Sequence, residues 1–123
     1  ILTTDDSFDI EFLFYSKEDF NELNLSFVLW SITGECVFNV ASEVMKAEKG
    51  LYKGVCRVPS NLLNNNIYSI EMMVIKDRSY AIFKQKDILT FEIVDGKRVK
   101  GWYGKWVGVV RPSLNFELDR VNE

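Results

Sequence analysis

Carboxylates are the side chains of this sequence whose types and spacing come nearest to catalytic chemistry. Asp9 and Glu11 lie two residues apart in an alternating segment, so a strand would place both on one face, roughly 7 Å apart. Glycosidases use two carboxylates about 5–10 Å apart. Paired acids on a strand are far more often solvated charges on its outer face. We therefore predict that the domain is not an enzyme, with a glycoside-processing enzyme as the distant alternative.

Metal and cofactor motifs are missing from the sequence. Histidine does not occur, which excludes His-dependent triads and His metal ligands. Neither a G-x-x-x-x-G-K-[ST] loop nor a G-x-G-x-x-G turn is present, so nucleotide binding by those motifs is excluded. Cys36 and Cys56 lie 20 residues apart without a C-x-x-C pair, which fits no common zinc framework. We expect no metal and no cofactor, and the two cysteines are either a disulfide of a secreted protein or small buried apolar residues of a cytosolic one.

Length and composition bound the class of protein. The chain has 123 residues, of which 47% are apolar and 14% aromatic, and this suits one domain with a packed core. The formal net charge is −3 and the basic residues are scattered, so nucleic-acid binding is disfavoured. No apolar run approaches the roughly 20 residues that cross a bilayer. The chain starts at Ile1, and we expect residues 1–7 to be the remnant of a linker from an upstream domain.

The dominant hydrophobic pattern has a period of two residues, which is typical of half-buried strands. Between the predicted strands, residues 41–49 are expected to form a loop or a helical turn, and 77–86 a polar loop. Pro59 cannot donate a backbone hydrogen bond and ends one strand. The predicted strands cover residues 8–15, 23–30, 36–40, 51–58, 67–76, 88–94 and 113–118.

Seven or eight short strands with turns at intervals of roughly ten residues predict an all-β fold. The expected architecture is an antiparallel two-sheet β-sandwich, either immunoglobulin-like or jelly-roll-like, over residues 8–118, followed by a C-terminal tail at 119–123. A βαβ arrangement would need helices of ten or more residues between the strands, and only 41–49 offers room for one. We therefore reject it.

The order and spacing of several short motifs resemble a known family. Together they resemble the C-terminal domain of Wzt-type proteins, the ATP-binding subunits of ABC exporters for O-antigen and related polysaccharides, over roughly 8–118. The sequence departs from the family at Asn66-Ile67, where a glycine is expected, and at Phe116, where tryptophan is frequent. The motifs are Leu25-x-Phe27, Gly34-x-x-Val37-Phe38, Gly50-x-Tyr52, Val58-Pro59-x-Asn61-Leu62-Leu63-Asn64, Tyr68-x-Ile70 and Gly108-x-Val110-Arg111-Pro112-x-Leu114-x-Phe116.

The resemblance implies a non-catalytic carbohydrate-binding module in the cytoplasm, peripheral to the inner membrane. It would recognise the finished O-antigen polysaccharide and couple it to export. Its partners would be the glycan and, through an upstream ATPase domain, the transmembrane subunit of the exporter. Such exporters pair their ATPase subunits, which implies a homodimer. The alternative is a structural or protein-interaction sandwich that docks another exporter subunit or a polymer-finishing enzyme.

Sugars stack their C–H faces on aromatic rings and bond through their hydroxyls to polar side chains. Trp30 is the sharpest candidate, because it lies out of phase with the core residues of its strand. The other interpretation of Trp30 is that it covers the end of the sandwich, and the late aromatic residues could equally form a buried anchor or a subunit interface. The predicted carbohydrate-binding residues are Trp30, Asn24, Ser26, Glu71, Met73, Tyr80, Phe83, Trp102, Tyr103 and Trp106.

The break at 108–112 before the last predicted strand suggests a hinge. Arg111 is expected to stabilise this bend by bonding carbonyl groups or a carboxylate. The apolar strand that follows could pair with its own sandwich or with that of a partner, and the latter arrangement would give a strand-exchanged dimer.

Overall fold

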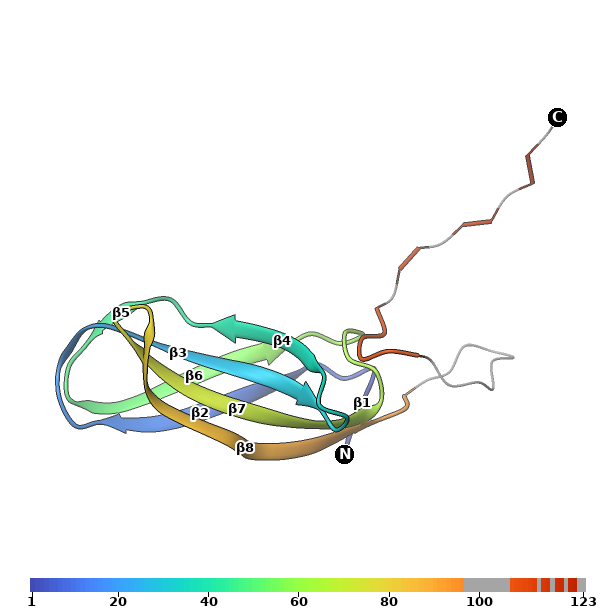
Figure 1. The fold of residues 1–123 in the computed structure, drawn as a ribbon. Coiled ribbons are helices and arrows are strands. Elements are labelled where there is room, and N and C mark those ends of the chain that lie inside the picture. The colour runs from blue at the N-terminus through green and yellow to red at the C-terminus, as the bar shows by residue number, and fades with distance from the viewer. Residues whose placement is uncertain (97–106, 113, 116, 119, 122–123) are drawn as a thin grey trace.

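Eight β-strands and no helix make up the described part of the chain (Figure 1). The structure is a computed structural model that describes residues 1–96, 107–112, 114–115, 117–118 and 120–121. Among these residues, no helix is long and apolar enough to cross a membrane. The strands are β1 (Leu2–Thr3), β2 (Phe8–Ser16), β3 (Phe20–Ser31), β4 (Cys36–Ala41), β5 (Met45–Ala47), β6 (Gly50–Val58), β7 (Asn66–Lys76) and β8 (Tyr80–Val94).

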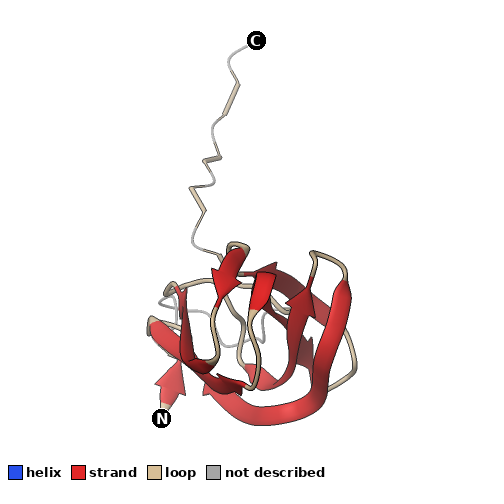
Figure 2. Ribbon diagram, turned by 90° about the vertical axis from the view of Figure 1, so that its left-hand side faces the viewer, coloured by secondary structure: helices blue, strands red, loops and turns tan. Residues whose placement is uncertain are grey.

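The strands form two sheets, as the period-two pattern predicts. The large sheet has the order β1-β8-β7-β3-β4, with β5 also paired to β3, and the small sheet consists of β2 and β6. All pairs are antiparallel except β1 with β8. Seen from the side, the strands of both sheets surround one interior (Figure 2). The predicted two-sheet β-sandwich is therefore confirmed.

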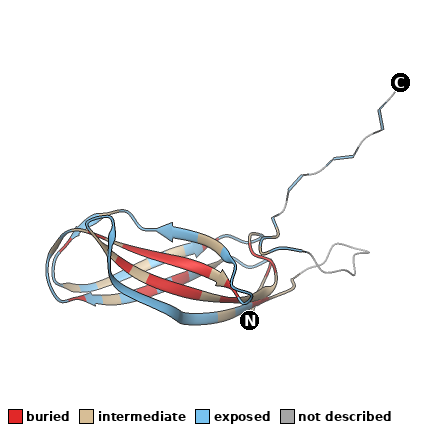
Figure 3. Ribbon diagram, viewed as in Figure 1, coloured by how far each residue is buried: buried red, intermediate tan, exposed pale blue. Residues whose placement is uncertain are grey.

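Apolar residues from both sheets form one buried cluster, and the buried positions are marked along the strands in Figure 3. Ile10 and Phe12 of β2 face Leu25, Phe27 and Leu29 of β3, and the Phe12 and Phe27 ring centroids are 5.2 Å apart. The inward face of β7 is also buried. Its buried core residues are Tyr68, Ile70, Met72 and Val74. Burial of large apolar side chains is the main driving force for such a core.

Two segments expected to be loops contain strands. Residues 41–49 contain β5 in place of a helical turn, and 80–86 belong to the long strand β8. Asp77 and Arg78 have φ values of 51° and 67°, so two consecutive left-handed residues turn the chain from β7 into β8, as in tight hairpins. Residues 80–86 are polar because this part of β8 is exposed, as is every residue of 80–90, and not because they form a loop.

The two ends of the chain also differ from expectation. Leu2 and Thr3, expected to belong to a linker, pair with Ile93 and Val94, so the large sheet begins before residue 8. The strand predicted over 113–118 is not formed at the described residues of that range. Leu114 and Leu118 are 79% and 94% exposed.

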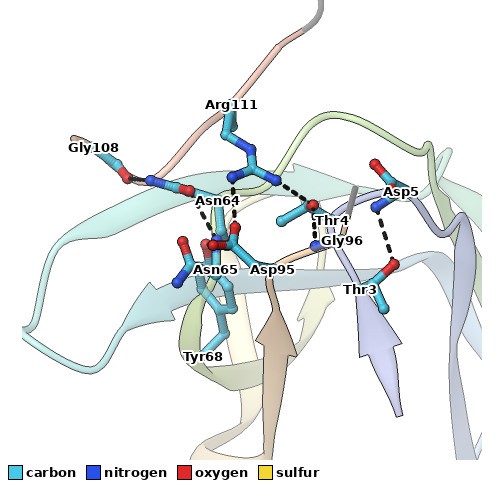
Figure 4. Close-up of polar contacts among 10 residues, drawn as sticks. All are labelled: Thr3, Thr4, Asp5, Asn64, Asn65, Tyr68, Asp95, Gly96, Gly108 and Arg111. Atoms are coloured by element: carbon cyan, nitrogen blue, oxygen red, sulfur yellow. Dashed lines mark hydrogen bonds and ion pairs between the residues drawn. The ribbon is translucent and has the colours of Figure 1, made fainter. Parts of the chain in front are cut away.

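One end of the sandwich is closed by the turn between β6 and β7 and by residues 108–111 (Figure 4). Leu63 of this turn is buried, and it forms an isolated bridge with Val110. Asn64 donates through its side-chain amide to the Gly108 carbonyl at 2.6 Å. Arg111 pairs with the Asp95 carboxylate at 2.6 Å and also donates to the Thr4 hydroxyl. Arg111 thus stabilises the bend through a carboxylate, as predicted.

Candidate functional site

The outer face of the large sheet brings five of the predicted binding residues onto two adjacent strands. β3 and β7 pair so that Ser26 lies opposite Met73 and Val28 lies opposite Glu71. Asn24 and Trp30 occupy the same phase of β3, because side chains two residues apart share a face. Because β3 and β7 lie side by side in one sheet, these residues share one surface.

Trp30 is held in place on this face by the neighbouring strands. Its indole Nε1 donates a hydrogen bond to Glu71 Oε1 at 3.2 Å. Lys86 of β8 lies over the indole, with its Nζ 5.1 Å from the ring centroid, a distance at which a cation is attracted to the ring. The side chain is therefore oriented by a carboxylate at its edge and a cation over its ring.

Glu71 is a buried acid on the outer face of the sheet, with 4% exposure. Its Oε1 accepts the indole hydrogen bond, and its Oε2 forms an ion pair with Lys84 at 3.7 Å. The Oε2 atom accepts no hydrogen bond within the described part of the chain. Burial of a carboxylate is costly unless it is paired. The contacts with Trp30 and Lys84 supply this pairing, and they fix the position of Glu71 between the two side chains.

A groove of about 350 Å³ opens beside Trp30. It lies between the turn after β3, the start of β7 and the middle of β8, and it combines an aromatic wall with polar side chains. Ligand-binding pockets typically combine aromatic and apolar walls with a few polar groups, and they have volumes of about 300–1,000 Å³. The residues around it are Trp30, Ser31, Ile32, Gly34, Ile67, Tyr68, Ser69, Lys86, Asp87 and Thr90.

The polar side of this groove was not predicted. The sequence predicts a loop at Lys86 and no element at Asp87, and Ser69 and Thr90 lie on strands where small polar residues carry no functional signal. β8 reaches the groove through an irregularity, because Ile70 pairs with Leu89 while Met72 pairs with Gln85. Three residues of β8 therefore lie opposite one residue of β7, and such bulges redirect side chains.

The remaining predicted residues lie away from the groove. Ser26 is buried, and its hydroxyl lies 3.2 Å from both Asn39 Oδ1 and the Val40 carbonyl. Asn24 is directed to the Ser42 carbonyl, at 3.5 Å. Tyr80 and Phe83 are exposed on β8 near the β7–β8 turn. Trp102, Tyr103 and Trp106 lie outside the described residues.

Asp9 and Glu11, the two acids with glycosidase-like spacing, are each engaged in an ion pair on the small sheet. Asp9 forms a two-bond ion pair with Arg57, at 3.0 and 3.3 Å, and Glu11 pairs with Lys53 at 3.4 Å. Both acids thus belong to cross-strand pairs on the outer face. Within the described ranges, no group of three or more His, Cys, Asp or Glu residues is placed to hold a metal ion.

The two cysteines are free thiols on different sheets. Cys36 is exposed, contrary to the buried position expected for it in a reduced protein, and Cys56 is half-buried. Burial raises the pKa of the Cys56 thiol, and the nearby Asp9 carboxylate adds to this effect. A raised pKa keeps this sulfur in its weakly nucleophilic thiol form.

A second, more apolar groove lies between the two sheets, at β4 and β6. It has a volume of about 280 Å³ and is lined by core residues, among them Phe12, Leu25 and Phe27. β4 and β6 border it. Among the described strands β4 pairs only with β3 and β6 only with β2, so each presents an unpaired backbone edge.

Comparison with known proteins shows a likeness in fold to a solved structure. No family model matches the sequence, and no curated protein matches it. Among solved structures, the chain is similar to the crystal structure of the C-terminal domain of Wzt, with a TM-score of 0.77 and 13% sequence identity. The similarity covers 94% of this chain and 72% of that chain. It confirms, at the level of the fold, the resemblance that the sequence motifs indicate: this chain has the fold of the C-terminal domain of Wzt.

Proposed function

We propose that this domain is a non-catalytic carbohydrate-binding module that recognises a cell-surface polysaccharide, with its site at the groove beside Trp30. The observation that carries the proposal is the pairing of a half-buried, oriented indole with a 350 Å³ groove bearing polar side chains. An aromatic face takes the C–H side of a sugar ring, while hydroxyl, ammonium and carboxylate groups bond its hydroxyls.

The fold supports the wider part of the proposal. A fold alone does not determine function, but the similarity to the C-terminal domain of Wzt agrees with the sequence motifs. We therefore extend the proposal to a role in polysaccharide export: the domain binds O-antigen in the cytoplasm and couples it to an ABC exporter. The coupling would run through an ATPase domain that contacts the transmembrane subunit at the inner membrane.

We further propose that the domain forms a homodimer through its last apolar segment. Residues 114, 116 and 118 are Leu, Phe and Leu, and the two leucines are exposed in the single chain. The apolar groove between β4 and β6 offers two unpaired strand edges and an apolar floor. Such an edge readily accepts another strand. Segment 113–118 of a second copy would offer this surface an alternating apolar sequence, with Leu114, Phe116 and Leu118 in one phase.

Binding is tested by calorimetry with the O-antigen polysaccharide purified from the strain that encodes the chain. We expect heat with the natural protein and none with Trp30→Ala, at an unchanged melting temperature. Tyr15→Ala is the matched control, because Tyr15 is an exposed aromatic residue, 58% accessible, on the outer face of the small sheet. The absence of binding by the natural protein would refute the proposal, and release of reducing ends over time would show an enzyme.

One observation favours a second function, a protein-interaction module. The outer face of the small sheet exposes four large apolar side chains. A contiguous exposed apolar surface often marks an interaction site. The four residues are Leu13, Tyr15, Leu51 and Val55, at 65%, 58%, 69% and 55% exposure. Loss of exporter association in Leu51→Lys, with glycan binding intact, would identify this face as the docking surface.

A further inference from the structure

The backbone of Asp87 has a left-handed conformation in the middle of a strand. Four non-glycine residues of the described chain have positive φ: Asn61, Asp77, Arg78 and Asp87. The first three lie in turns, where such a conformation reverses the chain. Asp87, with φ of 53°, lies within β8 instead, where the chain does not turn. Conformations of this kind persist where the surroundings impose them, and they gather at functional sites.

The irregularity places Asp87 at the groove beside Trp30. Residues 86–88 of β8 lie opposite the single residue Glu71, and both Lys86 and Asp87 line the groove as a result. The Asp87 carboxylate is exposed and makes no hydrogen bond or ion pair with any residue that the structure describes. Glu71, by contrast, is engaged by Trp30 and Lys84. Asp87 is thus the carboxylate of this site with its acceptor oxygens free.

We infer that the bulge at Lys86–Ile88 is the specificity element of the site, and that Asp87 accepts hydrogen bonds from two neighbouring hydroxyls of a neutral sugar stacked on Trp30. This inference rests on the proposed carbohydrate-binding function. An ionised carboxylate only accepts hydrogen bonds, and its two oxygens match two adjacent hydroxyl donors. Lys86 and Asp87 are the charged residues that line the groove, and their formal charges cancel. A uronic acid would bring a second carboxylate toward Asp87, so a neutral sugar is preferred.

Lys86 has a complementary role. Its ammonium lies over the indole in the free protein, so a sugar that stacks on that face of Trp30 displaces it. The displaced ammonium is a donor with no acceptor function, suited to a ring or hydroxyl oxygen of the same sugar. The bulge therefore supplies one donor group and one acceptor group to a single ligand.

The experiment compares Asp87→Asn with Asp77→Asn, using calorimetry with the same O-antigen polysaccharide. Asp77 is the matched control, because it is also an exposed aspartate with positive φ but lies in the β7–β8 turn. We expect affinity to fall about tenfold in Asp87→Asn, as for the loss of hydrogen bonds to a charged group, and to change less than about twofold in Asp77→Asn.

A second variant separates a binding role from a structural one. Asp87→Gly removes the carboxylate and also relieves the positive φ, because glycine adopts this conformation freely. We expect weaker binding together with a melting temperature equal to or above that of the natural protein. In competition experiments, methyl glucoside, mannoside or galactoside should displace the polysaccharide, and methyl glucuronide should not.

The possible results distinguish this inference from the function on which it rests. If the natural protein binds and Trp30→Ala does not, but Asp87→Asn binds normally, Asp87 is not a specificity residue while the carbohydrate site stands. Preferential competition by the glucuronide would likewise overturn the inference alone. If the natural protein binds no polysaccharide, the proposed function itself fails.

Discussion

The guanidinium of Arg111 and the carboxylate of Asp95 form an ion pair at 2.6 Å in which the side chains are only 16% and 24% exposed. Arg111 also donates to the Thr4 hydroxyl, and its backbone N–H donates to the Leu62 carbonyl at 2.8 Å. One residue therefore joins the N-terminal segment, the end of β8 and the turn before β7. Its bonds hold residues 108–111 against the closed end of the sandwich.

Replacing Arg111 by methionine should destabilise the domain by about 2 kcal/mol, because the partly buried Asp95 carboxylate loses its ion pair with Arg111. The matched control is Arg78→Met. Arg78 also pairs with a carboxylate, Glu22, at 2.6 Å, but the side chains are 69% and 38% exposed. Such a surface pair contributes little, and we expect a loss below about 0.5 kcal/mol. The free energy of unfolding in urea measures both, and equal losses would contradict a special role for Arg111.

Glu71 is predicted to act on binding by orienting Trp30. Glu71→Gln keeps an oxygen that accepts the indole N–H, whereas Glu71→Met removes it. We expect the Trp30 indole resonance in a ¹H–¹⁵N spectrum to stay in place in the first variant and to move in the second. Affinity for the polysaccharide should fall about fivefold in Glu71→Met, the loss expected for one hydrogen bond of about 1 kcal/mol.

Stability serves as the control for the Glu71 variants. Methionine is apolar and similar in size to glutamate, and replacing a buried ionic group in this way is often nearly neutral. The half-buried indole N–H reaches water once the ring moves. We expect unfolding free energies within about 1 kcal/mol of the natural protein. Equal affinities of the two variants would show that the Glu71–Trp30 bond does not matter for binding.

The strands that the sequence predicts correctly are those that bury one face between the two sheets. β2, β3 and β7 each bury one face against the opposite sheet, so their apolar residues alternate visibly along the sequence. β8 was only half recognised, because Tyr80–Thr90 are all exposed and no alternation marks a strand without cover. β1 has two residues and pairs with a strand more than 90 residues away, which leaves no local pattern to read.

The candidate site divides in the same way. Trp30 and Glu71 were found because each lies out of phase with the buried residues of its own strand. The sequence does not predict Asp87 as a site residue, because its position depends on the register between β7 and β8. That register cannot be deduced from the sequence of either strand alone. The contact of Lys86 with Trp30 has the same origin. The groove is completed by the way β7 and β8 pair, and this pairing cannot be deduced from the type of any single residue.

Strand exchange is predicted to depend on Leu114. Leu114→Asp places a charge in the segment that would enter the apolar groove between β4 and β6, where an unpaired charge is costly. We expect the natural protein to be a dimer by light scattering at high micromolar concentration and this variant to be a monomer. Leu13→Asp is the control, because Leu13 is similarly exposed, at 65%, but lies on the small sheet. A monomeric natural protein would refute strand exchange.

Tyr68 should make the stability of the domain fall at high pH. Its side chain is fully buried, and its hydroxyl donates to the Asn64 carbonyl at 2.6 Å, with the Val109 carbonyl at 3.1 Å. Burial raises the pKa of Tyr68 to about 12, whereas an unfolded chain has a tyrosine pKa of about 10. Since the folded pKa is the higher one, the folded state binds more protons in this interval. The contribution is complete below pH 10 and is lost as the pH rises toward 12.

The two pKa values correspond to a loss of about 2 kcal/mol across this interval. Tyr68→Phe cannot ionise and lacks the hydroxyl, so it should be less stable than the natural protein by about 1 kcal/mol at pH 8. The two proteins differ only at residue 68, so the difference between their two curves of stability against pH isolates the contribution of Tyr68. We expect unfolding measurements in urea to show the natural protein losing its advantage, and then becoming the less stable of the two, between pH 10 and 12. Parallel curves would mean that the Tyr68 phenol ionises alike in both states.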